Sequence, residues 1–127
     1  GCRMMISNEL LFRALVRAIL AAVKERGIRK LSFLLPFVSE CREVSYLKGI
    51  ITGYAAADGI EATIGIEIAT PRAACIAGEL AAQADAMVFN VEELVQLLYG
   101  MSRFDTRKVI SCYLHENVFR HNPFVEF

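Results

Sequence analysis

The chain has 127 residues, enough for one domain or a section of one, and 55% of them are hydrophobic. Its 14 basic and 14 acidic residues cancel to a net charge of zero, and no basic stripe interleaves with aromatic residues, which argues against a nucleic-acid partner. No apolar run approaches the ~20 residues of a membrane span, and the first residues do not read as a signal peptide, so we expect no membrane association.

The four cysteines, Cys2, Cys41, Cys75 and Cys112, are far apart in the sequence and form no CxxC pair. Disulfide frameworks and zinc sites both need closer grouping. This spacing predicts free thiols and a cytoplasmic location. The first residue is glycine rather than methionine, which is compatible with a processed or excised piece.

Hydrophobic periodicity predicts strands that alternate with helices along the chain. The predicted strands are the tail of one at Gly1–Ile6, followed by Leu31–Leu35, Ile64–Ala69 and Ala86–Asn90. The predicted helices run from near Glu9 to Gly27, then over Glu40–Ala57, Thr70–Ala81, Val91–Arg103 and Thr106–Phe119.

Four β-α units followed by an extra helix predict an α/β protein with parallel strands and right-handed crossovers. Periodicity alone leaves two arrangements open, a complete flavodoxin-like sheet and a section of a larger fold. In either arrangement, chemistry is expected where the carboxyl ends of the strands hand over to helices.

Two stretches carry a family resemblance: IGIEIATPRAACIAGELA at Ile64–Ala81 and AMVFNVEELVQLLYGMSRFD at Ala86–Asp105. They resemble the barrel with which pyruvate phosphate dikinases, a branch of the phosphoenolpyruvate-utilising enzymes, bind phosphoenolpyruvate (PEP) and pyruvate. Arg72 and the GMSRFD run favour that branch. The resemblance implies that residues 1–127 form a single partial domain, about half of a (β/α)8 TIM barrel.

The resemblance also implies magnesium, which this family holds between two carboxylates. The first ligand position falls on Ala69, so that ligand is absent. Glu67 faces the same side of the strand, roughly 6–7 Å further from its end, and is either a displaced ligand or a buried acid that needs a partner. The second position is Glu93. It either binds the metal or, together with Glu92, is an acidic residue at a helix N-terminus, where its charge interacts favourably with the helix dipole.

For the substrate, the resemblance points to Arg3, a bidentate donor to phosphate or carboxylate, and to Glu92, which replaces an asparagine. A carboxylate at that position only accepts hydrogen bonds, and it repels an anion. Asn90 stands where the family has glycine. Arg72 and Arg103 are expected to stabilise loops and the barrel rim, and Gln96 to orient a loop.

No residue here matches the phosphohistidine or the proton-donating cysteine that the resemblance implies for the reaction. We therefore expect a fragment of a dikinase-like phosphotransferase that is inactive alone. The alternative is a non-catalytic, degenerate barrel piece that acts in assembly or regulation. Half a barrel leaves open strand edges, so self-association or docking with other barrel segments is expected.

Overall fold

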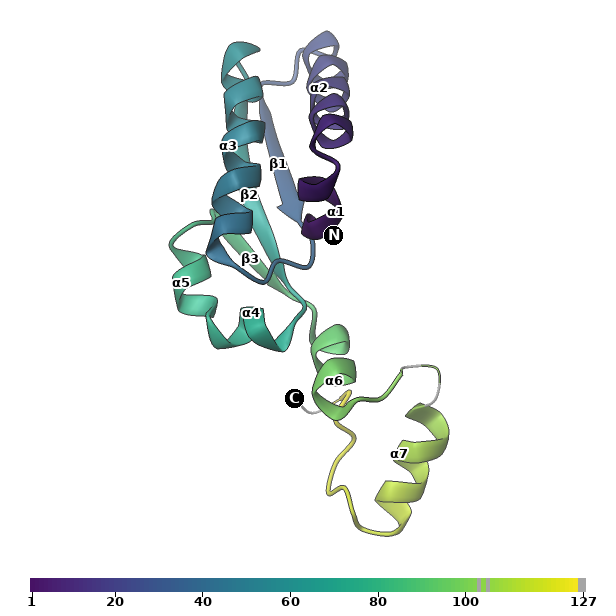
Figure 1. The fold of residues 1–127 in the computed structure, drawn as a ribbon. Coiled ribbons are helices and arrows are strands. Elements are labelled where there is room, and N and C mark those ends of the chain that lie inside the picture. Colours follow the sequence, from purple (N-terminus) through teal and green to yellow (C-terminus); the bar gives the residue numbers. More distant parts are fainter. Residues whose placement is uncertain (103, 105, 126–127) are drawn as a thin grey trace.

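A computed structural model describes residues 1–102, 104 and 106–125, which form one parallel sheet and seven helices (Figure 1). The strands are β1 (Lys30–Leu35), β2 (Glu61–Ile68) and β3 (Ala86–Phe89). The helices are α1 (Cys2–Ser7), α2 (Glu9–Glu25), α3 (Cys41–Ala57), α4 (Pro71–Cys75), α5 (Ala77–Ala81), α6 (Val91–Tyr99) and α7 (Thr106–His115).

The sheet has three strands in the order β1-β2-β3, and both pairs are parallel. Because both pairs are parallel, the carboxyl ends of the strands lie at the same edge of the sheet; β2 and β3 end level at Ile68 and Phe89, and β1 ends level with Ile66. Strands that follow one another in the sequence are therefore neighbours in space. This is the arrangement of a barrel section.

The core lies on one face of the sheet. Ile64, Ile66 and Ile68 of β2 are fully buried, in one cluster with residues of α2 and α3. These two helices lie on the same side of the sheet (Figure 1). The opposite face carries a shallow groove of about 380 Å³, where Leu34 and Val88 are 51% and 48% exposed.

The predicted α/β class with parallel strands is confirmed, and the described residues form no closed barrel. A flavodoxin-like sheet would carry helices on both faces. One face of this sheet is uncovered instead, which is consistent with a partial barrel.

The strand predicted at Gly1–Ile6 is wrong, because Cys2–Ser7 form α1. The structure thus has three β-α units where four were predicted. The Cys2 side chain is buried, and both its backbone N–H and its thiol donate to the Pro36 carbonyl, at 3.2 and 3.1 Å. Methionine and arginine favour a helix, and the contact that holds this one lies 34 residues away in the sequence.

Three predicted helices differ in extent. The one predicted over Thr70–Ala81 is interrupted at Ile76, whose φ of −109° and ψ of 22° leave the helical region. The helix predicted to reach Arg103 ends at Tyr99, because Gly100 takes a left-handed conformation with φ of 62°. Residue Arg103 itself lies outside the described residues. The last helix ends at His115 rather than Phe119.

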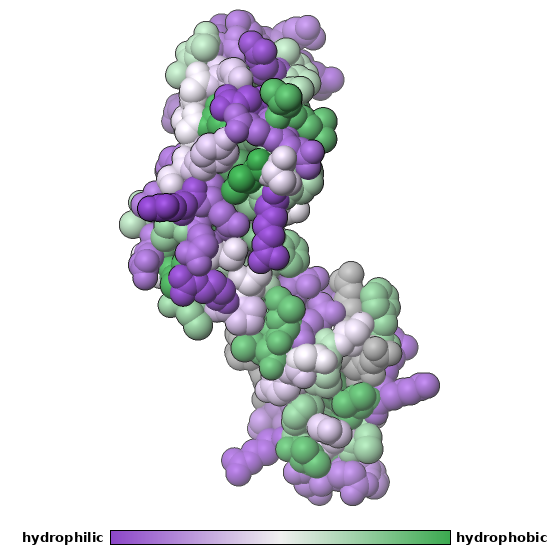
Figure 2. Space-filling model, viewed as in Figure 1, coloured by the Kyte–Doolittle hydropathy of each residue, from purple (hydrophilic) through white to green (hydrophobic). Residues whose placement is uncertain are grey.

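Helices α6 and α7 lie beyond the carboxyl edge of the sheet (Figure 1). They have a small cluster of their own, in which the Phe119 ring meets Tyr99 and Tyr113 at centroid distances of 5.5 and 5.0 Å. Figure 2 shows apolar residues gathered on this part of the surface. None of the helices within the described ranges is both long and apolar enough to cross a membrane.

The packing of α1 predicts unequal thiol reactivity. Burial raises the pKa of the Cys2 thiol to about 11, with a smaller contribution from the Glu43 charge. Cys75 and Cys112 are exposed. At pH 8, iodoacetamide should modify these two in the folded chain and Cys2 only after unfolding, as followed by peptide mass spectrometry. Labelling of Cys2 as fast as Cys75 would contradict the packing of α1.

Candidate functional site

The carboxyl ends of the three strands bring together five residues from separate parts of the chain. Glu67 belongs to β2, Phe37 follows β1, Asn90 follows β3, Glu93 lies in the first turn of α6, and Arg3 lies in α1. We call these five residues the strand-end site. Three of the four predicted site residues, Arg3, Glu67 and Glu93, are among them.

Glu67 has a hydrogen-bond partner for each of its carboxylate oxygens. Oε1 accepts from Nδ2 of Asn90 at 2.9 Å, and Oε2 accepts from the backbone N–H of Phe37 at 3.2 Å. The alternation of β2 places Glu67 on the uncovered face of the sheet, where it is half-buried. The sequence reading of Glu67 as an acid that needs a partner agrees with these contacts.

Asn90 joins this carboxylate to α6. Its Oδ1 accepts from the backbone N–H of Glu93 at 3.2 Å and so caps the N-terminus of the helix, while its Nδ2 donates to Glu67. Asparagine is a preferred N-cap residue, so the cap itself could be predicted from the sequence. The bond to Glu67 could not, because it spans 23 residues.

Phe37 has a positive φ of 54°, in the left-handed region that costs a residue with a Cβ roughly 1–2 kcal/mol. The hydrogen bond from its N–H to Glu67 helps to hold this conformation. The carboxylate therefore fixes the loop after β1 as well as the start of α6. No sequence pattern pointed to Phe37 as a site residue.

Arg3 lines a cavity of about 220 Å³ together with Gly1, Cys2, Phe37 and Thr70. Although α1 replaces the predicted strand, the arginine still lies near the ends of β1 and β2. Its guanidinium is exposed, and such a group can donate two parallel hydrogen bonds to a carboxylate or phosphate. Its role in binding stays a prediction.

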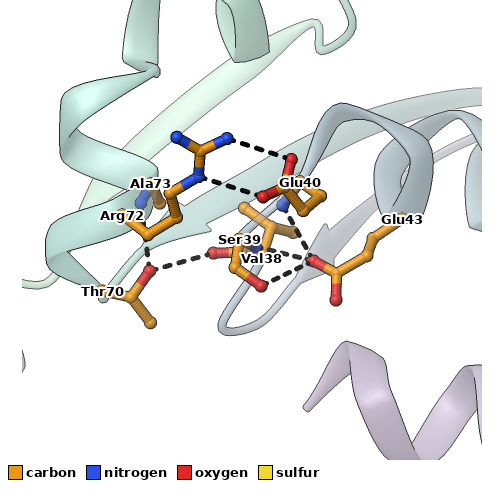
Figure 3. Close-up of polar contacts among 7 residues, drawn as sticks. All are labelled: Val38, Ser39, Glu40, Glu43, Thr70, Arg72 and Ala73. Carbon is orange, nitrogen blue, oxygen red and sulfur yellow. Dashed lines mark hydrogen bonds and ion pairs between the residues drawn. The ribbon is translucent and has the colours of Figure 1, made fainter.

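Arg72 stabilises loops, as predicted. Its Nε and Nη2 donate to the two oxygens of Glu40 at 3.0 and 3.3 Å, which ties the start of α4 to the start of α3 (Figure 3). In the same view, Thr70 caps α4 by accepting from Ala73 N–H at 3.1 Å. Glu43 accepts from the N–H groups of Ser39 and Glu40 at 2.7 and 3.0 Å.

The strand-end site does not fit magnesium as it is arranged. Ala69 supplies no ligand and is fully buried, and each oxygen of Glu67 already accepts an N–H. Across the described ranges, no group of three or more His, Cys, Asp or Glu side chains could hold a metal ion. Magnesium requires near-octahedral oxygen ligands and tolerates displaced ones poorly. The roles predicted for Glu67 and Glu93 as ligands stay predictions.

Glu92 and Glu93 lie in the first turn of α6, where acidic side chains interact favourably with the helix dipole. Glu92 is exposed and Glu93 is half-buried. Their position agrees with the alternative reading given above. Whether Glu92 also meets a substrate stays a prediction.

Comparison with known proteins gives a family match over residues 1–123, to the family described as PEP-utilising enzyme, PEP-binding domain. The chain is 34% identical over 134 residues to a chloroplastic pyruvate, phosphate dikinase from Flaveria pringlei, an alignment that covers 98% of the chain. It is 32% identical over 137 residues to the pyruvate, phosphate dikinase of Rickettsia bellii, with the same coverage. The chain spans only 14% and 15% of the length of these relatives.

The Arg72–Glu40 pair predicts a pH-dependent contribution to stability. The hydrogen bonds from Arg72 lower the pKa of Glu40 below its ordinary value of 4.5. A lowered pKa means that the pair stabilises the fold above pH 4.5 and ceases to do so as the pH falls through the pKa of the folded state. The Tm difference between wild type and Arg72→Ala, measured by circular dichroism, should be constant from pH 6 to 8 and vanish at low pH. A difference that does not shrink as the pH falls below 4.5 toward 2 would contradict this role.

Proposed function

The chain belongs to the family of PEP-utilising enzymes, whose PEP-binding domain it matches, and we propose that it is a barrel section of a dikinase-like phosphotransferase that contributes PEP- or pyruvate-binding residues. The observation that carries this proposal is the cavity beside Arg3, at the carboxyl ends of β1 and β2. In β/α barrels, substrates bind at that end of the strands. On this proposal, residues 1–127 are one partial TIM-barrel domain.

The chemistry proposed for these residues is binding and orientation. Arg3 would pair with the carboxylate or phosphate of the ligand through two N–H groups. Thr70 and Phe37 line the same cavity and would set its shape. Glu92 and Glu93 would limit affinity for an anion, because their charges lie at the same edge of the sheet.

We further propose that the chain does not carry out phosphoryl transfer alone. Neither His115 nor His121 stands in the phosphohistidine pattern that the resemblance implies, and none of the four cysteines stands in the motif of its proton donor. Magnesium, with Glu67 and Glu93 as ligands, stays a prediction from the sequence, and the hydrogen bonds of Glu67 argue against it. A cytoplasmic location also stays a prediction.

A second candidate function is a non-catalytic role in assembly or regulation. The uncovered face of the sheet favours this role. Leu34 of β1 and Val88 of β3 present apolar surface there, and β1 and β3 are the two edge strands of the sheet. Unpaired strand edges accept strands from another chain. The partner on this proposal is a second copy or a complementary barrel segment.

The first proposal predicts that the purified chain binds PEP or the enolate mimic oxalate through Arg3. Isothermal titration calorimetry should show saturable binding that Arg3→Ala weakens about tenfold or more, since a charged hydrogen bond contributes about 1.5–3 kcal/mol. Titrations with and without magnesium or manganese show whether a metal contributes.

The matched control is Arg26→Ala, which removes an exposed arginine at the far end of α2 and should leave the binding isotherm unchanged. Circular dichroism would show that each variant is folded. A folded wild-type chain that binds neither PEP nor oxalate, with or without metal, would contradict the proposed half-site.

The second proposal predicts association through the uncovered face. Sedimentation velocity should show a sedimentation coefficient that rises with concentration in the wild type. Leu34→Lys combined with Val88→Lys should abolish this rise, because both side chains lie on that face. The control Val118→Lys alters a 62%-exposed residue after α7 and should not affect association. Equal behaviour of the two variants would contradict the assignment of the interface.

A further inference from the structure

The hydrogen bonds of Glu67 suggest a role that differs from metal binding. A carboxylate only accepts hydrogen bonds, and here one oxygen receives the side-chain amide of Asn90 and the other the backbone N–H of Phe37. The two donors approach from the loops that follow the neighbouring strands, β3 and β1. One side chain of the central strand therefore connects both neighbouring strand ends.

The orientation of the Asn90 amide follows from its two partners. Its oxygen must face the Glu93 N–H, which can only donate, and its NH₂ must face the Glu67 carboxylate, which can only accept. In the reverse orientation the Asn90 oxygen would face the Glu67 carboxylate, two acceptors together, and its NH₂ would face the Glu93 N–H, two donors together. The side chain is thus fixed with an N–H directed at the oxygen that a cation would need.

Phe37 supports the same reading. Its left-handed conformation, with φ of 54°, is unfavourable for a residue with a Cβ and needs support from surrounding contacts. Its N–H points to Glu67, so the carboxylate compensates for backbone strain in the loop after β1. A cation at Glu67 would compete with this contact as well as with Asn90.

We propose that Glu67, the Asn90 amide and the Phe37 N–H form a metal-independent clamp, in which Asn90 is a positioning residue that occupies the place of a divalent cation. The clamp holds the ends of β1, β2 and β3 and the start of α6 in one arrangement. It does not depend on whether the chain binds PEP, and it replaces the metal-ligand role predicted for Glu67.

A donor–acceptor exchange tests the clamp. Asn90→Asp keeps an N-cap acceptor for α6 but faces Glu67 with a second carboxylate, and Glu67→Gln keeps an acceptor for Phe37 but faces the Asn90 amide with a second NH₂ group. Each single variant should lower the Tm by about 4–8 °C, as expected for the loss of one charged hydrogen bond. In the double variant, the new amide donates to the new carboxylate, and most of the loss should be recovered.

The matched control is Glu61→Gln, the same substitution at the opposite, exposed end of β2. It should cost little, and combining it with Asn90→Asp should recover nothing. A Glu67→Gln/Asn90→Asp variant whose Tm loss equals the sum of the two single losses would overturn the proposal, because the side chains would then not be in contact.

A metal titration gives an independent test that starts from the unaltered chain. The wild-type Tm should be the same in magnesium chloride, in manganese chloride and in sodium chloride of equal ionic strength. A rise in Tm specific to the divalent ions, lost in Glu67→Gln and retained in Glu61→Gln, would show that Glu67 binds metal and would overturn the clamp.

Discussion

The arrangement of the whole site depends on the one-sided burial of β2. Ile64, Ile66 and Ile68 are buried in one cluster with residues of α2 and α3, so the period of two sends Thr63, Gly65 and Glu67 to the opposite face. A shift of one residue would place Glu67 in the apolar core and expose the isoleucines. The core therefore fixes the only acid of the strand interior at the edge where three loops meet.

That edge can be stabilised in two physically different ways. A divalent cation requires several oxygen ligands around one point, whereas a hydrogen-bonded carboxylate needs only N–H donors directed at its oxygens. This chain has the hydrogen-bonded carboxylate, because Asn90 and Phe37 supply N–H donors to Glu67. The ion pair between Arg72 and Glu40 separately ties the loop after β2 to the loop after β1.

Local sequence signals predicted most of the framework, and distant contacts caused the errors. The strand at Ile64–Ala69 and the helix from Glu40 were predicted from periodicity, and the structure adds a capping box formed by Glu40 and Glu43. The prediction of an N-terminal strand was wrong because α1 is held by a hydrogen bond to the Pro36 carbonyl, and local sequence patterns do not predict such a distant contact. Likewise, the acids of the site could be named from the sequence, but their partners could not, since the bond from Asn90 to Glu67 is non-local.

Membership of the family and the chemistry of the site are separate questions in this chain. The fold requires buried apolar residues on one face of β2. That requirement does not depend on which side chains stand at the carboxyl ends of the strands. Metal binding requires more: a ligand beyond β2 and a carboxylate free to accept a cation. Ala69 is fully buried, and Glu67 is engaged by donors from both neighbouring loops. Restoring a carboxylate at position 69 alone would therefore not suffice, because the Asn90 amide would still hold Glu67, and the new side chain would need space in a packed region. Metal binding at Glu67 and the proposed clamp would therefore compete for the same two oxygens.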